Sequence, residues 1–289
     1  MDLLVRGYAI PVARRALGAD RVVEWTATMA DRPGDAGAEA LKQGGYDVSI
    51  HAFPDAAVLK AAHRAGIPMR IATGRRWQGL RYATHRCWDS RRASGGHEAW
   101  HGLRLLLPLN IDPVRAHRTA CGLEAPKADP VVRSHLASVD RPLALLHPGS
   151  HGSAGNWPPE RFAELATRLA DAGYSVGLTG TEREKEAFAP HRPNRPNIVD
   201  YGGQFDLTQL MALQSAAALV VASSTGPLHT AAALGTPCVG LYGPAAPEWA
   251  ERWAPLGPSV RVCTAEACTA DGALELSVDN VLEACLNQL

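Results

Sequence analysis

Short apolar runs alternate with segments of helical spacing along the first half of the chain. The apolar runs are residues 2–5, 21–25, 46–51 and 68–73, and the helical segments between them are 9–18 and 55–66. Strands that alternate with helices are typical of parallel βαβ units. Because the runs lack polar alternation, we expect strands that are buried on both faces.

The alternation stops between residues 75 and 96, where Arg, Trp, Ser and Gly dominate the sequence. This segment is interpreted as a long loop. A helix is expected to follow over residues 97–109, since Trp100, Leu103 and Leu107 recur at helical spacing.

The pattern resumes after a proline-rich and charged stretch at residues 122–142. The predicted strands are 143–147, 174–180, 197–202, 218–223 and 237–243; the predicted helices are 158–172, a segment from Glu182, 206–217, 227–235 and 277–289. The last helix has Ser277 or Asp279 as its candidate cap. The sequence therefore predicts two α/β domains, 1–138 and 139–289, with helix 277–289 as a candidate for packing back on the first.

Composition narrows the class of protein. The 289 residues are 46% hydrophobic and 20% charged, as expected of a water-soluble globular chain without a transmembrane helix. The first fifteen residues lack the features of a secretory signal, which favours the cytoplasm. The six cysteines form no CxxC pair, so reduced thiols are favoured over a metal site.

Positive charge is concentrated between residues 64 and 118, although the net charge is zero. Arginines such as Arg75, Arg76 and Arg81 suit bidentate binding of carboxylates or phosphates, and a solvated arginine surface explains them equally well. No nucleic-acid-binding motif accompanies the charge, so we expect no nucleic-acid partner.

Three loops at the carboxyl ends of predicted strands contain the candidate ligand-binding residues, because open parallel sheets bind their ligands at these ends. In the loop 148–156, Ser150 lies among glycines that suit a phosphate. In the second loop, Thr181 precedes Glu184, which could reach a ribose or base or could simply compensate the helix dipole.

The third loop joins the strand 218–223 to an alanine-rich helix. Thr225, Gly226 and Pro227 open this helix, and the N–H groups of Gly226, Leu228 and His229 are expected to point above the sheet. This geometry suits a diphosphate. His229 could donate to a phosphate oxygen, although a lone histidine is commonly structural.

The order, spacing and identity of the residues between His147 and Gly257 resemble those of the family nine glycosyltransferases. These are the bacterial ADP-heptose:lipopolysaccharide heptosyltransferases. The resemblance rests on "HPGS…NWPPERFAELATRLADAGYSVGLTGTEREKE", "DLTQLMALQSAAALVVASSTGPLHTAAALGTPCVGLYGP" and "PEWAERWAPLG". It is weaker in the first domain. It implies a GT-B fold, in which two doubly wound Rossmann-like lobes face a central cleft, and here the N-terminal lobe lacks its first strand.

The resemblance also implies the ligands and the reaction. A nucleotide sugar, ADP-heptose, would bind the second lobe near Ser150, Thr181, Glu184, Phe205, Ser224, Thr225, Gly226, Pro227 and His229. An anionic inner-core glycolipid would meet Arg75, Arg76 and Arg81 in the first lobe, at the inner face of the inner membrane. Transfer would be inverting, with no metal and no cofactor.

Three positions depart from the family pattern. The aspartate of the usual Gly-Asp loop is not matched, Gly155 replaces the usual lysine, and Ser224 replaces the usual aspartate. The general base is therefore unassigned, with His97, Glu98, Asp89 and His101 as candidates. A catalytically impaired relative that binds a nucleotide or a partner is the alternative; an epimerase would need paired acids and bases, and the sequence offers no such cluster.

Overall fold

The computed structural model describes residues 1–31, 36–89, 96–114, 122–150, 155–245 and 249–288. It divides into two compact units: one holds Met1–Arg14 and Gly18–Ala120, and the other holds Arg15–Leu17 and Cys121–Leu289. The division lies earlier than the boundary expected after residue 138. The reason is that α8 (Pro130–Ala137) packs on α11 (Leu207–Ala216) of the second unit.

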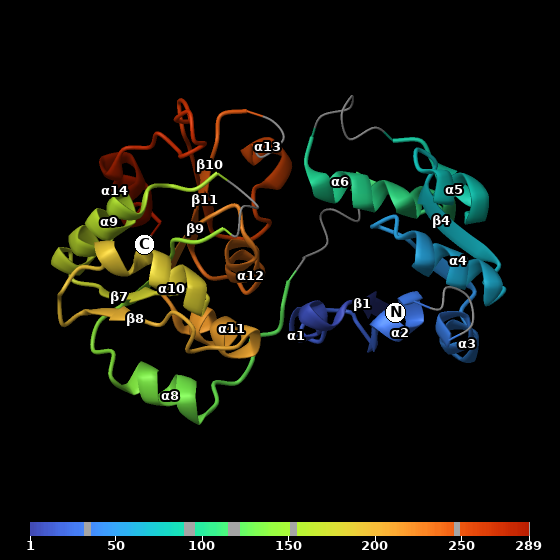
Figure 1. Cartoon of the computed structure of the whole chain (residues 1–289), viewed down its shortest axis with the longest axis horizontal. Helices are drawn as coiled ribbons and strands as arrows, with labels where there is room; N and C mark the ends of the chain where they lie inside the picture. Colours follow the sequence, from blue (N-terminus) through green and yellow to red (C-terminus); the bar gives the residue numbers. More distant parts are fainter. Residues whose placement is uncertain (32–35, 90–95, 115–121, 151–154, 246–248, 289) are drawn as a thin grey trace. The chain divides into compact units, whose positions relative to one another are not determined.

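The second unit is built around one six-stranded parallel sheet (Figure 1). Its strands are β6 (Leu143–His147), β7 (Ser175–Leu178), β8 (Ile198–Asp200), β9 (Leu219–Ser223), β10 (Cys238–Tyr242) and β11 (Val260–Thr264). They lie in the order β11-β10-β9-β6-β7-β8, so the direction of winding reverses between β6 and β9. This reversal is the topological switch point of a doubly wound sheet, where such folds bind their ligands.

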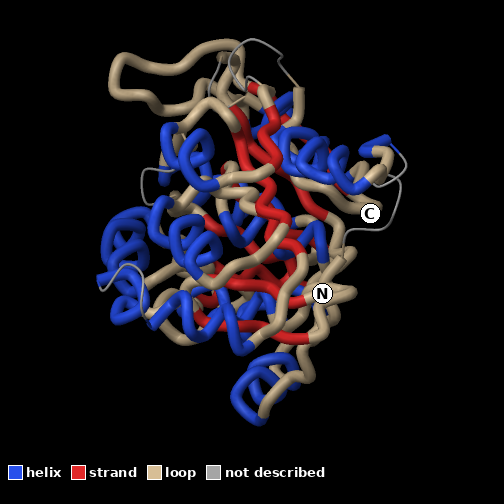
Figure 2. Tube along the Cα trace, turned by 90° about the vertical axis from the view of Figure 1, so that its right-hand side faces the viewer, coloured by secondary structure: helices blue, strands red, loops and turns tan. Residues whose placement is uncertain are grey.

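Helices cover both faces of this sheet. Figure 2 distinguishes the helices, strands and loops of the chain by colour. The remaining helices of the unit are α9 (Pro159–Asp171), α10 (Glu182–Phe188), the 3-10 helix η3 (Ala189–His191), α12 (Gly226–Ala233), α13 (Ala250–Trp253) and α14 (Val278–Leu286). Apolar side chains of α9 and α14 fill one core, and those of α8, α11 and α12 fill the other. Every residue of β6, β7, β9 and β10 is buried, as is typical of the central strands of a parallel sheet.

Helix α14 packs on α9, β10 and β11, all within its own unit. The Ser277 hydroxyl accepts a hydrogen bond from the Asn280 N–H at 3.2 Å, so Ser277 is the cap of this helix. Strand β11 was not expected from the sequence. It is an edge strand whose residues are partly exposed, so its pattern lacks the buried run of the other strands.

The first unit contains two smaller parallel sheets. One pairs β1 (Asp2–Val5) with β2 (Arg21–Glu24), and the other has β3 (Val48–Ile50), β4 (Met69–Thr73) and β5 (His85–Cys87) in that order. The helices are η1 (Gly7–Ala9), α1 (Ile10–Ala13), α2 (Ala27–Asp31), α3 (Ala36–Gln43), α4 (Ala56–Arg64), α5 (Trp77–Tyr82), α6 (Glu98–Leu103) and the 3-10 helix η2 (Arg104–Leu109).

Three expectations for the first unit are wrong. Its strands are not buried on both faces, because β1 is only partly buried and both β2 and β3 have exposed residues. Residues 75–96 are not one long loop, since they contain α5 and β5. Both elements are short and polar, and β5 lies at a sheet edge, so they leave no periodic apolar signal. The helix expected over residues 97–109 changes at Arg104 into the 3-10 helix η2, which contains Pro108.

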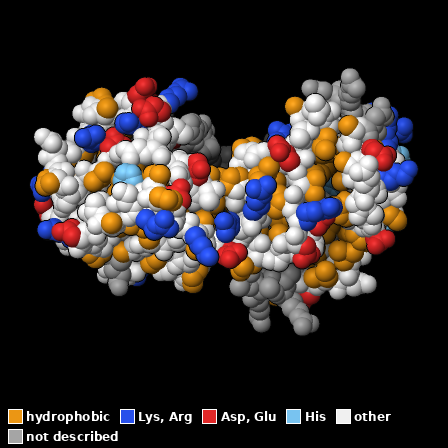
Figure 3. All heavy atoms as spheres, turned by 90° about the horizontal axis from the view of Figure 1, so that it is seen from below, with side chains coloured by type: hydrophobic (Ala, Val, Ile, Leu, Met, Phe, Trp, Pro, Cys, Tyr) orange, Lys and Arg blue, Asp and Glu red, His pale blue; other side chains and the backbone are white. Residues whose placement is uncertain are grey.

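Two further findings concern the described residues only. None of their helices is both long enough and apolar enough to cross a bilayer. Nowhere among them do three His, Cys, Asp or Glu side chains gather in a way that could hold a metal ion. On the face drawn in Figure 3, basic and acidic side chains are interspersed, in keeping with the zero net charge.

Candidate nucleotide-binding site

The switch point of the second unit brings two sequence-predicted loops together. Strand β6 pairs with β9 in a register that places His147 opposite Ala222. The loop that starts at Pro148 and the loop that starts at Ser224 therefore leave the sheet from neighbouring strands. Residues 151–154 of the first loop lie outside the described residues, whereas Gly149, Ser150 and Gly155 are within them.

A cavity of about 360 Å³ lies beside the switch point, at the carboxyl ends of β6, β7 and β8. Ser150 and Glu184 line it together with Trp157, Phe188 and Asp200. Cationic side chains reach it from Arg183 and Lys185 on α10. The cavity thus combines apolar walls with a small number of charged groups, which is the usual composition of a small-molecule site.

Glu184 is fixed in this cavity by the start of α10. Its carboxylate oxygen Oε2 accepts hydrogen bonds from the Thr181 N–H at 2.8 Å and the Thr181 hydroxyl at 2.9 Å, which completes a capping box. The carboxylate also lies against the backbone of Gly149, where a Cβ would be 1.8 Å from Oε1. Only a glycine leaves room for Glu184 there, and this close approach could not be predicted from the sequence.

The third loop places Thr225 at the N-cap of α12. Its hydroxyl makes no capping hydrogen bond, and the side chain is only 7% exposed. Neither Thr225 Oγ1 nor the Ser223 hydroxyl has a hydrogen-bond partner among the residues that the structure describes. Since a buried hydroxyl without a partner costs about 1–3 kcal/mol, two such groups at one loop are unusual for purely structural residues.

The N–H groups of this loop are arranged differently from the expectation. The N–H groups of Leu228 and His229 donate to the Thr225 carbonyl, at 3.1 and 3.3 Å, and so do not point above the sheet. They are satisfied because they close the first turn of α12. The Gly226 N–H makes no hydrogen bond within the described part of the chain, and a Cβ on Gly226 would meet open space.

Two other predicted site residues have structural partners. The Ser224 hydroxyl lies beside the phenol of Tyr242, whose pKa burial raises to about 12 and whose hydroxyl donates to the Trp253 carbonyl at 2.8 Å. Phe205 packs edge-on against His135 at 5.2 Å between ring centroids and lies 5.4 Å from the ring of Tyr201. Phe205 does not line the 360 Å³ cavity, so its role near an adenine stays a prediction.

The predicted acceptor residues belong to the first unit and surround α5. Arg75, Arg76 and Arg81 are all exposed. The Arg75 Nε donates to the Trp88 carbonyl at 3.3 Å, and the Arg81 guanidinium lies 6.0 Å from the centre of the Tyr82 ring. Their guanidinium groups are therefore available to solvent anions, those of Arg75 and Arg76 just after the carboxyl end of β4 and that of Arg81 in the last turn of α5.

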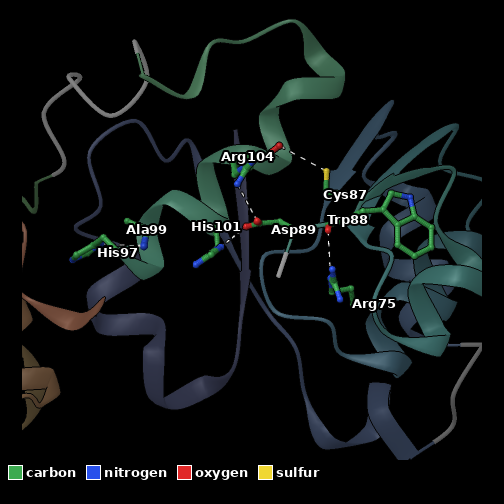
Figure 4. Close-up of polar contacts among 8 residues, drawn as sticks. All are labelled: Arg75, Cys87, Trp88, Asp89, His97, Ala99, His101 and Arg104. Atoms are coloured by element: carbon green, nitrogen blue, oxygen red, sulfur yellow. Dashed lines mark hydrogen bonds and ion pairs between the residues drawn. The ribbon is translucent and has the colours of Figure 1, made fainter. Parts of the chain in front are cut away.

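The candidates for the general base fall into two groups around α6 (Figure 4). His97 caps this helix by accepting the Ala99 N–H at its Nδ1, 3.2 Å away, and Glu98 follows in the first turn. Asp89 and His101 instead contact each other directly through Oδ2 and Nδ1. The Arg104 Nη1 lies 2.9 Å from the other Asp89 oxygen, Oδ1.

The second unit thus has the features of a nucleotide-binding Rossmann sheet: a switch point, a cavity beside it, and a helix start whose Thr225 hydroxyl and Gly226 N–H have no partner among the described residues. A family model described as glycosyltransferase family 9 (heptosyltransferase) matches residues 38–275, most of the chain. The chain belongs to this family.

Known relatives agree with the assignment. Lipopolysaccharide heptosyltransferase 2 of Escherichia coli K12 is 35% identical over 131 residues, which is 43% of this chain and 37% of that protein. The match therefore spans well under two thirds of the relative's length.

Solved structures extend the likeness to the fold. The E. coli ADP-heptose lipopolysaccharide heptosyltransferase II has a TM-score of 0.76 at 22% identity, covering 99% of this chain and 88% of its own. The E. coli heptosyltransferase WaaC with ADP has a TM-score of 0.66 at 18% identity, covering 100% of this chain and 90% of its own. The GT-B fold class expected from the sequence is confirmed.

Proposed function

We propose that this protein is a heptosyltransferase that transfers heptose from ADP-heptose to an inner-core lipopolysaccharide or a related acceptor. Family membership supports the reaction class. The observation that carries the proposal is the start of α12, where the buried Thr225 hydroxyl and the Gly226 N–H have no partners within the described residues. A diphosphate would supply acceptor oxygens for both donors.

Glu184 is the second element of the proposed donor site. A carboxylate held over Gly149 by the Thr181 cap can accept hydrogen bonds from the hydroxyls of a ribose. In the proposed donor site, Ser150 and His229 contact the diphosphate and Phe205 contacts the adenine. ADP is the proposed nucleotide because a relative of the same fold is described with ADP.

The proposed chemistry is an inverting displacement without a metal ion. An acceptor hydroxyl loses its proton to a base and attacks the anomeric carbon, while the bond from that carbon to the diphosphate breaks. The positive end of the α12 dipole and the donors at its start stabilise the negative charge that grows on departing ADP. No residue of this site is assigned to metal binding.

The acceptor is proposed to be an anionic glycolipid. Exposed Arg75, Arg76 and Arg81 supply guanidinium groups that pair with carboxylates or phosphates in bidentate fashion. A lipid-linked acceptor would be met at the inner face of the inner membrane, with the protein itself in the cytoplasm. Anionic lipid would strengthen this contact electrostatically.

A catalytically impaired relative is the second candidate, and it is favoured by the two substituted donor positions. A Cβ on Gly155 would lie 2.9 Å from Leu274 Cδ2 and 3.3 Å from the Gly272 carbonyl, so a lysine would not fit here without rearrangement. The Ser224 hydroxyl lies beside the phenol of Tyr242 and, unlike an aspartate, carries no charge. Such a protein would still bind ADP but would not transfer a sugar from ADP-heptose.

Calorimetric titration with ADP, UDP and GDP tests the proposed donor site. We expect ADP to bind in preference to UDP and GDP, and Thr225→Ala and His229→Ala to weaken that binding. Absence of binding to any of the three nucleotides would remove the donor site. ADP-selective binding without heptose transfer would favour the impaired relative.

A further inference from the structure

The carboxyl edge of the β3-β4-β5 sheet carries a charged cluster that the donor site does not use. Asp89 lies two residues beyond the end of β5, and its two oxygens contact His101 and Arg104, which come from α6 and the start of η2 (Figure 4). Loops at this edge of a parallel sheet are where substrates bind. The cluster therefore lies where a bound substrate could contact it.

The contact between Asp89 and His101 is buried, whereas the contact between Asp89 and Arg104 is partly exposed. The side chain of His101 is 5% exposed and that of Asp89 is 15% exposed, whereas Arg104 is 47% exposed. The guanidinium of Arg104 favours the ionised form of the Asp89 carboxylate, and its exposure means that water partly screens this attraction. The charge of Asp89 also acts on the neighbouring thiol, because burial and this carboxylate together raise the pKa of Cys87.

An ionised Asp89 determines which ring nitrogen of His101 carries the proton. The carboxylate accepts a hydrogen bond from Nδ1–H, which leaves the lone pair of the neutral ring on Nε2. None of the residues that the structure describes forms a hydrogen bond with Nε2. A carboxylate that holds one ring nitrogen while the other faces a substrate proton is the arrangement of a histidine base.

The surroundings suit an anionic acceptor. The Arg75 Nε donates to the carbonyl of Trp88, the residue directly before Asp89, at 3.3 Å. Arg75 is exposed, so its remaining N–H groups can bind a carboxylate or phosphate beside the cluster.

We propose that His101 is the general base of the transfer reaction and that Asp89 is the residue that positions it. This inference rests on the proposed heptosyltransferase function. Nε2 of His101 takes the proton of the acceptor hydroxyl, whose oxygen forms the bond to the anomeric carbon. The bond from that carbon to the diphosphate breaks, its electron pair leaves with ADP, and His101 then returns the proton to water.

The test compares His101→Gln, Asp89→Asn and the double variant with the unchanged chain. His85→Gln is the matched control, because it removes an exposed histidine of β5 in the same sheet. ADP-heptose is the donor, and inner-core lipopolysaccharides ending in Kdo or in phosphorylated heptose are the two acceptors. The measurements are kcat, the KM for each substrate, the Kd for ADP and the melting temperature.

We expect His101→Gln to lower kcat by roughly 10²–10⁴-fold, the usual contribution of a general base. The Kd for ADP should stay within about threefold, since the donor site is built in the second unit. Asp89→Asn should lower kcat as well. The double variant should lower kcat no further than His101→Gln alone, because Asp89 acts only through His101. His85→Gln should retain kcat.

Three outcomes would overturn the assignment. If the unchanged chain transfers heptose and His101→Gln keeps kcat within about threefold, His101 is not the base although the proposed function stands. If the losses in kcat parallel losses in melting temperature and in ADP affinity, the cluster is structural. If the unchanged chain binds ADP but transfers nothing to either acceptor, the proposed function fails and the base assignment fails with it.

Discussion

Replacing Thr225 by valine tests whether the Thr225 hydroxyl binds a ligand or stabilises the fold. Valine keeps the shape of threonine, and its β-branch suits the extended backbone at this N-cap, where φ is −131° and ψ is 166°. No capping hydrogen bond is lost, because the Thr225 hydroxyl makes none. The substitution therefore removes a buried hydroxyl that has no partner among the described residues.

Thr225→Val is expected to act in opposite directions on the stability of the protein and on its affinity for ADP. Since an unsatisfied buried hydroxyl costs about 1–3 kcal/mol, Thr225→Val should leave the free energy of unfolding unchanged or raise it by about 1 kcal/mol. ADP affinity should fall, because a hydrogen bond to a charged phosphate contributes about 2 kcal/mol, equivalent to roughly 30-fold in Kd. Urea unfolding measures the first effect, and calorimetric titration with ADP measures the second.

Thr230→Val is the matched control on the same helix. Thr230 is also 7% exposed, but its hydroxyl donates to Gln214 Oε1 at 2.8 Å. This variant leaves the Gln214 oxygen without its donor, so it should destabilise the protein by about 1–2 kcal/mol with ADP affinity unchanged. If Thr225→Val instead destabilises the protein as much as Thr230→Val and binds ADP normally, the assignment of Thr225 is refuted.

Three further predictions concern other parts of the molecule. Burial lowers the pKa of His51 from 6.5 to about 4, so the folded state should lose up to about 3 kcal/mol of stability as pH falls from about 6.5 towards 4. Urea unfolding at pH 7 and pH 5 should show about 2 kcal/mol of this loss, and His51→Gln should abolish it. Gly149→Ala should push Glu184 out of place, weaken ADP binding and cost about 1 kcal/mol of stability through the lost α10 cap, as calorimetry and melting would show. Gly226→Ala, whose methyl group meets open space, should leave the melting temperature unchanged but weaken ADP binding; unchanged affinity would argue against close approach of a phosphate.

The second unit was largely predictable because its strands are buried on both faces. The apolar runs at 143–147 and 218–223 lie almost where β6 and β9 do, and small residues mark the loops that follow them. The first unit was less predictable. Its β5 and α5 are short and carry exposed arginines, so no periodic signal distinguishes them from a loop.

The candidate site was predictable in its residue types but not in its contacts. Thr225 and Glu184 follow strands, so the sequence could place them at one edge of the sheet. The contact of Glu184 with Gly149 joins residues 35 positions apart in different βα units, and no local pattern encodes it. The same holds for Asp89 and His101, which the sequence offered only as separate candidates.

The most direct test of the central claim is a transfer assay with ADP-heptose and an inner-core acceptor in the presence of EDTA. The proposed function predicts acceptor-dependent release of ADP and a product whose anomeric configuration is inverted, at a rate that EDTA leaves unchanged. Selective binding of ADP without any acceptor-dependent release would contradict it and would leave this chain as a nucleotide-binding member of its family.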